Sequence, residues 1–195
     1  MGPGRFDIDL VGRLLVATPE LVGPEFERTV ILVLEHSRGE GALGVVLNRP
    51  MGVPVVAELP SWADSDVLAE PAVVFAGGPV QDDSVLVVAL ARPGAELGEL
   101  RPVTSRMVVV PVTAEPGQAQ RWSEGVRVFA GYAGWGRGQL EGEVAAGYWY
   151  VVDSEPSDLV GAEPAGLWRA VLRRQRGPQA HLALVASWTA DPELN

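Results

Sequence analysis

The alternation of apolar and polar segments along the chain predicts a domain that mixes strands with helices. Two neighbouring segments, Thr29–His36 and Leu43–Asn48, are rich in β-branched residues, and the turn Ser37–Gly41 between them holds two glycines. This pattern is typical of an antiparallel hairpin. Because Thr29–His36 is apolar over most of its length, we expect it to be a central strand that is covered on both faces.

Further elements are expected on both sides of this hairpin. Short apolar segments predict seven more strands: Arg13–Thr18, Ala72–Phe75, Ser84–Leu90, Met107–Val112, Arg127–Tyr132, Tyr148–Asp153 and His181–Trp188. Four segments are predicted to be helices: Pro54–Leu59, Pro116–Glu124, Gln139–Ala146 and the amphipathic Ala165–Arg176. The polar segment Ser61–Glu70 is expected to be exposed. Since consecutive strands often lack a helix between them, the pattern favours one mixed-sheet α+β domain, residues 1–195, over a doubly wound parallel sheet.

The composition supports a folded domain and restricts its partners. Hydrophobic residues make up 47% of the chain and charged residues 21%, which allows a core and excludes disorder of the chain as a whole. There are 25 acidic and 15 basic residues, for a net charge of −10. An acidic surface repels the phosphate backbone, so unaided binding to nucleic acid is not expected.

Missing residue types exclude several chemistries. The chain has no cysteine, and all of its basic residues are arginine. Thiolate nucleophiles, cysteine-ligated zinc, Schiff-base lysines and Walker loops are therefore excluded. The two histidines, His36 and His181, lack the spacing of a zinc motif, so neither a metal nor a cofactor is expected. No targeting signal or apolar run of membrane-spanning length is apparent, so we expect a cytoplasmic protein without a membrane partner.

Two glycine-rich segments have both a functional and a structural interpretation. Gly134–Gly138 lies between a predicted strand and a predicted helix, like a dinucleotide loop, but its third glycine comes one position early for that motif. We favour a tight turn that lets Trp135 pack and begins the helix at Gln139. Gly77–Val80 could present backbone N–H groups to an anion, although such a turn is more often structural.

Arginines at the strand ends are candidates for an anion site. Arg28 precedes the central strand, while Asn48 and Arg49 follow the next one. If the two arginines converge, they form an anion pocket on an otherwise acidic protein; alternatively, each is salt-bridged or solvated. A second group of arginines, within Arg169–Arg176, falls near the end of the last predicted helix. There it is expected to complement the helix dipole rather than to form a nucleic-acid face.

Five sequence blocks together resemble the YqgE/AlgH family of bacterial proteins, over roughly residues 8–175. Phe26 and the late Trp168 also fit the family. Ser84–Leu90 departs from it, because many members have a histidine in this strand. The ending Asp191–Asn195 looks like an actinobacterial branch. The matching blocks are Gly12–Leu21, Arg28–His36, Gly41–Pro50, Gly77–Val80 and Gly131–Glu143.

The resemblance implies an α+β fold with a bifurcated, coiled sheet, part of it barrel-like and surrounded by helices. It implies no established enzymatic activity. Members are often labelled transcriptional regulators on genetic grounds. The acidic balance of this chain argues against direct operator binding, so any regulation would act through a protein partner or a small ligand.

The first hypothesis for function is therefore a non-enzymatic, cytoplasmic binding or regulatory protein with no catalytic residue. Its cleft would hold a small anionic ligand or a protein partner. One alternative is a hydrolase acting on a phosphorylated or carboxylated metabolite, with His36 or Glu35 as general base. A further alternative is direct DNA binding through Arg169–Arg176. The residues expected to gather at the cleft are Thr18, Arg28, His36, Asn48, Arg49, Gly77, Gly78, Trp135 and Gln139.

Overall fold

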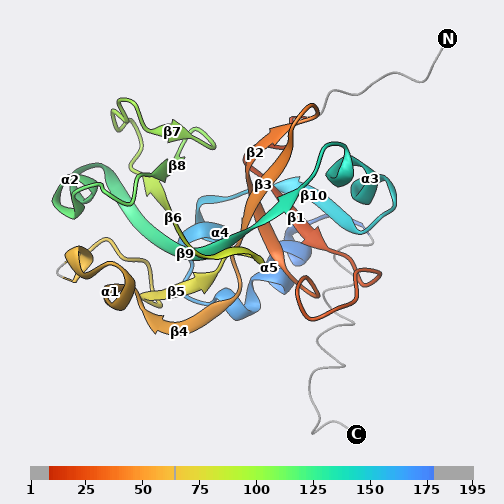
Figure 1. The fold of residues 1–195 in the computed structure, drawn as a ribbon, viewed down its shortest axis with the longest axis horizontal. Helices are drawn as coiled ribbons and strands as arrows, with labels where there is room; N and C mark the ends of the chain where they lie inside the picture. The colour runs from red at the N-terminus through yellow and green to blue at the C-terminus, as the bar shows by residue number, and fades with distance from the viewer. Residues whose placement is uncertain (1–8, 64, 178–195) are drawn as a thin grey trace, which may run out of the picture.

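Strand β2 (Val30–Ser37) lies inside the sheet, between β1 (Arg13–Ala17) and β3 (Gly41–Val46), and is antiparallel to both. The computed structural model describes residues 9–63 and 65–177 (Figure 1). Successive side chains of a strand point to opposite faces. Accordingly, Leu32 packs into one core cluster while Ile31 packs into another. The predicted hairpin and the burial of its first strand on both faces are confirmed.

The 13-residue strand β9 (Ser123–Trp135) connects the two halves of the sheet. Strand β6 (Val80–Ala91) runs antiparallel along one edge of β9. Along the other edge, β5 (Val73–Ala76) pairs in parallel with the middle of β9, and β3 pairs with its last residues. Because β5 and β3 share an edge, the sheet forks at β9 and curls into a half-barrel. This confirms the expected α+β fold with a bifurcated, coiled sheet (Figure 1).

The remaining strands extend the sheet. Strand β10 (Trp149–Asp153) pairs with the free edge of β1. On the other side, β8 (Met107–Val110) pairs with β6, and the short β7 (Arg101–Pro102) pairs with β8. Strand β4 (Pro50–Pro54), which directly follows Arg49, pairs with β5. The sequence patterns predict neither β4 nor β7.

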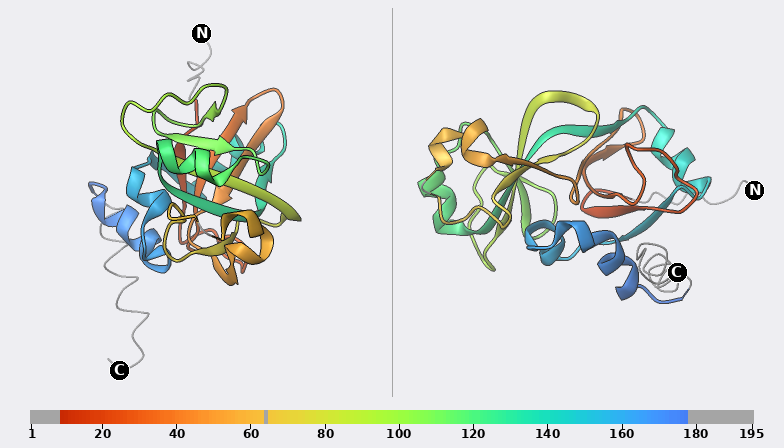
Figure 2. Two further views of the ribbon diagram at one scale, coloured as in Figure 1. Left: turned by 90° about the vertical axis from the view of Figure 1, so that its left-hand side faces the viewer. Right: turned by 90° about the horizontal axis from the view of Figure 1, so that it is seen from below.

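Helices cover both ends and one side of the sheet (Figure 2). Helices α1 and α2 lie at one end and α3 at the other, whereas α4 and α5 run along one side. Short 3-10 turns precede the last helix and follow the first. The bounds are α1 (Val55–Glu58), η1 (Pro60–Trp62), α2 (Pro116–Trp122), α3 (Gln139–Ala145), α4 (Pro156–Val160), η2 (Pro164–Gly166) and α5 (Leu167–Arg174).

Two expectations from the sequence need correction. The strand expected over Arg127–Tyr132 is confirmed, but it is longer than expected: β9 begins at Ser123, and backbone pairing with β3 carries it through Gly134 to Trp135. The segment Ser61–Glu70 is not exposed throughout: Trp62 is fully buried in the core between the sheet and α2. Val67 is buried in the same cluster, and Leu68 packs against it, so apolar side chains anchor this segment. The predicted strand His181–Trp188 lies outside the described residues.

Arg127 is buried at the fork of the sheet, although it is charged. Its Nε donates to the carbonyl oxygen of Leu159 at 2.6 Å, and its Nη2 donates to those of Glu70 and Gly161 at 3.0 and 3.1 Å. Its guanidinium carbon lies 4.2 Å from the centre of the Phe75 ring. Burial lowers the pKa of Arg127 to about 10, and the nearby charge of Glu70 only partly opposes this. Arg127 therefore fastens β9 to α4.

Candidate functional site

The β2–β3 hairpin brings Arg28 and Asn48 together at one end. Residue pairing runs from Ile31 opposite Val46 to Ser37 opposite Gly41. Antiparallel pairing therefore places the residues just before β2 beside the residues just after β3. The Oδ1 atom of Asn48 accepts the backbone N–H of Val30 at 3.0 Å, and its Nδ2 donates to the carbonyl oxygen of Arg28 at 2.8 Å. The buried Asn48 side chain thus acts as a bridge between backbones.

Arg28 has an unusual backbone conformation at this end of the hairpin. Its φ is +54°, in the left-handed region that few residues other than glycine adopt. A residue in this region is held there by its surroundings. The Arg28 guanidinium carbon lies 5.9 Å from the centre of the Trp168 ring, and its Nε lies 4.0 Å from Oε1 of Glu27. Arg28 therefore reaches from β2 toward helix α5.

Arg49 and Arg169 complete this group of cations. Nη2 of Arg49 donates to the carbonyl oxygen of Glu27 at 2.6 Å, which directs its side chain toward the residues before β2. Helix α5 is fixed beside them because Nε1 of Trp168 donates to the carbonyl oxygen of Ala17 at 2.9 Å. A cavity of about 390 Å³, here called the arginine cavity, lies between these segments. Its lining residues are Arg28, Asn48, Arg49, Pro50, Ala165, Trp168 and Arg169.

His36 and Trp135 lie around a second cavity, at the turn end of the hairpin. This cavity has a volume of about 470 Å³ and is also lined by Glu35 and Arg101, which form an ion pair. Nε2 of His36 lies 3.2 Å from Oε1 of Glu141, and the His36 side chain is only 6% exposed. At about 3.3 Å per strand residue, His36 lies roughly 26 Å along the hairpin from Arg28. The two groups therefore do not share a cleft.

Beside the second cavity, a carboxylate links two tryptophans. Oε2 of Glu143 accepts the indole N–H groups of both Trp135 and Trp149 at 2.8 Å. Its Oε1 accepts Nε2 of Gln139 at 2.9 Å, while Oε1 of Gln139 accepts the backbone N–H of Gly136 at 3.0 Å. Trp135 packs and helix α3 begins at Gln139, as the turn interpretation predicts, but Gly134 and Trp135 belong to β9, so the turn is shorter than Gly134–Gly138. β9 pairs with β3 and β10 with β1, so no dinucleotide-binding βαβ unit is present there.

The other predicted site residues are held inside the fold. The hydroxyl of Thr18 donates to the carbonyl oxygen of Gly147 at 2.8 Å. The N–H of Gly77 donates to Ala130 at 2.7 Å, and a Cβ at Gly77 would collide with the carbonyl oxygen of Gly131. A Cβ at Gly78 would collide with the backbone of Tyr132. These glycines permit close packing against β9, so the N–H of Gly77 is not offered to an anion.

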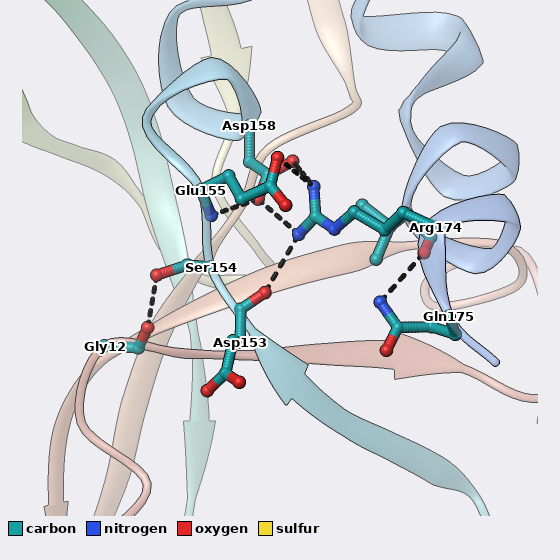
Figure 3. A network of polar contacts seen from close by, with 8 residues as sticks. Gly12, Asp153, Ser154, Glu155, Asp158, Arg174 and Gln175 are labelled. Atoms are coloured by element: carbon teal, nitrogen blue, oxygen red, sulfur yellow. Dashed lines mark hydrogen bonds and ion pairs between the residues drawn. The ribbon is translucent and has the colours of Figure 1, made fainter.

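The late arginines do not form one face. Arg174 points into an acidic network, where its Nη1 and Nη2 bind the two carboxylate oxygens of Asp158 at 2.6 and 2.7 Å (Figure 3). Nη2 also donates to the carbonyl oxygen of Asp153 at 2.9 Å. Burial alone would lower the pKa of Arg174, but the hydrogen bonds and charge of Asp158, with the other nearby acids, raise it above its ordinary value.

Arg169 has a different role from the one expected for the cluster. Instead of acting as a helix cap, it lines the arginine cavity. Sequence reasoning missed Arg169 and Ala165 as site residues, because their position depends on the docking of α5 against β1. The only local signal is the neighbouring Trp168, whose indole anchors that docking.

Comparisons with known proteins identify the family. The sequence model of the family described as AlgH-like, DUF179, matches residues 14–180. The chain belongs to the AlgH-like family. This confirms the resemblance to YqgE/AlgH proteins. A UPF0301 protein of Streptomyces coelicolor is 52% identical to this AlgH-like chain over 191 residues, covering 95% of each. One from Mycolicibacterium smegmatis is 45% identical over 175 residues, covering 88% of this chain and 86% of the relative, and the actinobacterial resemblance is likewise confirmed.

Solved structures agree with this AlgH-like assignment. A crystal structure of a Corynebacterium diphtheriae protein superposes with a TM-score of 0.85 at 31% identity, covering 92% of this chain and 94% of that one. The solution structure of the AlgH protein from Pseudomonas aeruginosa gives a TM-score of 0.65 at 26% identity, covering 93% and 96%. The half-barrel with its helices is therefore the fold of the family.

Neither a membrane-spanning helix nor a metal-binding cluster is found among the described residues. None of the helices in residues 9–63 and 65–177 combines the length and the apolar character needed to cross a bilayer. Within the same residues, no group of three or more histidine, aspartate or glutamate side chains is placed to hold a metal ion.

Proposed function

We propose that this AlgH-like protein is a binding protein that takes up a small anion in the arginine cavity. The observation that carries the proposal is the convergence of Arg28, Arg49 and Arg169 on one cavity. They come from three separate segments: the residues before β2, the residues after β3, and helix α5. Guanidinium groups bind carboxylates and phosphates through paired hydrogen bonds, so such a group of arginines suits an anion.

The charge of the whole chain strengthens this argument. The protein has a net charge of −10, so an anion is repelled by most of its surface. The three arginines that line the arginine cavity would attract an anion locally. The cavity volume of about 390 Å³ lies within the usual range of small-molecule sites.

The lining of the arginine cavity favours binding without turnover. Its described side chains are arginine, asparagine, proline, alanine and tryptophan. Arginine stays protonated at neutral pH, and the amide of Asn48 is held by two backbone groups. This lining supplies no general base or nucleophile. The proposed role is therefore that of a cytoplasmic binding or regulatory protein, which responds to a small ligand or passes that response to a protein partner.

The two alternatives have weaker support from the geometry. For a hydrolase, His36 would be the general base, but it is paired with Glu141, and neither Gly77 nor Gly78 is among the described residues lining its cavity. For direct DNA binding, the late arginines would need a common face, whereas Arg174 is bound within an acidic network.

The proposal is tested by NMR titration of isotope-labelled protein with inorganic phosphate, sulfate and citrate. We expect concentration-dependent shifts of the backbone amides of Arg28, Arg49 and Arg169. The Arg49→Gln variant should lose most of this binding. Arg137→Gln removes the same charge from an exposed position between β9 and α3, and should bind like the wild type. Equal binding by wild type and Arg49→Gln, or shifts centred on His36, would refute the proposal.

A further inference from the structure

We infer that a third cavity of this protein binds a small zwitterion that carries an apolar side chain, which is the chemical class of the apolar amino acids. The cavity, here called the α2 pocket, lies between helix α2 and the loop that joins β6 to β7 (Figure 1). None of its described lining residues also lines the arginine cavity, so the inference does not depend on the proposed function.

The two walls of the α2 pocket are joined by backbone hydrogen bonds. The N–H of Arg92, where the loop begins, donates to the carbonyl oxygen of Trp122, the last residue of α2, at 2.8 Å. Within the loop, the N–H of Leu100 donates to the carbonyl oxygen of Leu97 at 3.1 Å. The pocket has a volume of about 640 Å³, within the usual range of small-molecule sites. The fold therefore provides the pocket before a ligand arrives.

Much of the lining of the α2 pocket is apolar. Val110 and Ala119 are only 2% and 1% exposed and belong to the core cluster between the sheet and α2. Leu97, Leu100 and Trp122 pack against the same cluster but remain partly exposed. An apolar side chain in the pocket would cover surface that the fold leaves open to water, and this burial favours binding.

Charged side chains of both signs line the same pocket. Glu96 comes from the loop, Glu115 directly precedes α2, and Arg121 lies in the last turn of α2. All three are exposed, and among the described residues none of them forms an ion pair or a side-chain hydrogen bond. Two carboxylates and one guanidinium group are therefore available to a ligand.

This combination of charges suits a zwitterion better than a molecule with a single charge. A carboxylate accepts hydrogen bonds from an ammonium group, and the fork of arginine N–H groups pairs with a carboxylate. Glu115 and Arg121 lie about 9 Å apart along the helix axis, a separation that their long side chains can bridge through a ligand. A ligand with only an ammonium group would be repelled by Arg121, and one with only a carboxylate would be repelled by Glu96 and Glu115.

The test compares dissociation constants measured by NMR titration of isotope-labelled protein at neutral pH. The ligands are phenylalanine, glycine, 2-phenylethylamine and 3-phenylpropanoate. Phenylalanine should bind at least about tenfold more tightly than glycine, which has no side chain to bury. It should bind about three- to fivefold more tightly than the amine or the carboxylate, because exposed charge pairs contribute little. The shifts of backbone amides should centre on Leu97, Ala119 and Trp122.

Variants that remove charge separate the two parts of this recognition. Arg121→Gln should weaken phenylalanine binding about three- to fivefold without weakening the binding of 2-phenylethylamine. Glu96→Gln combined with Glu115→Gln should weaken phenylalanine binding without weakening that of 3-phenylpropanoate. Because these side chains are exposed and make no contact of their own, the variants should remain folded. Arg137→Gln removes the same charge from an exposed position outside the pocket, and should bind like the wild type.

Four results would overturn the inference. Glycine, or either ligand with a single charge, could bind as tightly as phenylalanine. Arg121→Gln could bind phenylalanine like the wild type, or phenylalanine could shift the amides of Arg28 and Arg49 instead of those of the α2 pocket. The proposed function is tested separately, with phosphate, sulfate and citrate and with the Arg49→Gln variant.

Discussion

Asn48 holds Arg28 in place: its Nδ2 donates to the carbonyl oxygen of Arg28 at 2.8 Å, across 20 residues of sequence. The same side chain accepts the backbone N–H of Val30 at 3.0 Å. One buried amide therefore joins the start of β2 to the end of β3, immediately before Arg49. This relationship fixes the backbone positions from which the two arginine side chains extend, which would lower the entropic cost of binding the proposed anion.

Replacing Asn48 should reduce the stability of the fold. Asn48→Ala leaves the N–H of Val30 and the carbonyl oxygen of Arg28 without their partner, and an unpaired buried polar group costs about 1–3 kcal/mol. We expect a loss in this range in the free energy of unfolding, measured by urea titration. Gln118→Ala, at an exposed position of α2, should change it by less than about 0.5 kcal/mol. Wild-type stability in Asn48→Ala would show that the bridge is dispensable.

The predicted hairpin already implied that the nine candidate site residues could not all lie together. Once Thr29–His36 is a strand, Arg28 and His36 must lie at opposite ends of it, because each residue advances the chain by about 3.3 Å. The same hairpin places Asn48 beside Arg28. The expectation of a single cleft ignored this length. The sequence therefore predicts that Arg28, Asn48 and Arg49 lie close together. It gives no basis for expecting all nine candidate residues to gather in one cleft.

Other features depended on contacts that the sequence does not reveal. The extension of β9 to Trp135 results from pairing with β3, whose residues lie about 90 positions earlier in the chain. Arg169 reaches the arginine cavity only because Trp168 anchors α5 to the backbone of β1. In both cases the local pattern, a glycine-rich segment and a basic helix end, is compatible with several structures. Tertiary packing selects among them.

The glycine turn before β6 should be intolerant of any side chain. A Cβ at Gly77 would collide with the carbonyl oxygen of Gly131, which belongs to the backbone of β9 and cannot rotate away. Gly77→Ala should therefore destabilise the protein by about 1–3 kcal/mol or more. Gly142, in helix α3, has open space at its Cβ position. Gly142→Ala should stabilise it by about 0.5–1 kcal/mol.

Thermal or urea unfolding compares the stabilities of the two variants directly, because each replaces one glycine with alanine. Equal effects of Gly77→Ala and Gly142→Ala would show that Gly77 does not pack closely against β9. A loss of anion binding in Gly77→Ala without a loss of stability would instead place the turn at the ligand.

Arg127 should be indispensable for the fork of the sheet. Arg127→Met retains an unbranched apolar chain above Phe75 but leaves three carbonyl oxygens without a donor. Each unpaired buried acceptor costs about 1–3 kcal/mol, so we expect a total loss of roughly 3 kcal/mol or more in the free energy of unfolding. Arg137→Met, at an exposed position, should change this energy by less than about 0.5 kcal/mol.

The lowered pKa of Arg127 also predicts how the difference in free energy of unfolding between the wild type and Arg127→Met varies with pH. Burial lowers the pKa of Arg127 to about 10 in the folded protein, below its value in the unfolded chain, so above about pH 10 the unfolded chain binds more protons. The stability of the wild type relative to Arg127→Met should therefore rise between about pH 9 and about pH 11, and should be constant between about pH 6 and about pH 8. A wild-type advantage that declines across the alkaline range would contradict the assignment.

The two ends of the hairpin should act independently in anion binding. His36 lies roughly 26 Å along β2 from Arg28, well beyond the screening length of about 8 Å at physiological salt. His36→Gln should therefore leave the dissociation constant for inorganic phosphate within about twofold of the wild type, whereas Arg49→Gln should raise it at least about tenfold. Arg101→Gln, which breaks the ion pair with Glu35 at the second cavity, should likewise have no effect. If His36→Gln or Arg101→Gln weakened binding as much as Arg49→Gln, the anion would occupy the second cavity, or the hairpin would couple the two ends.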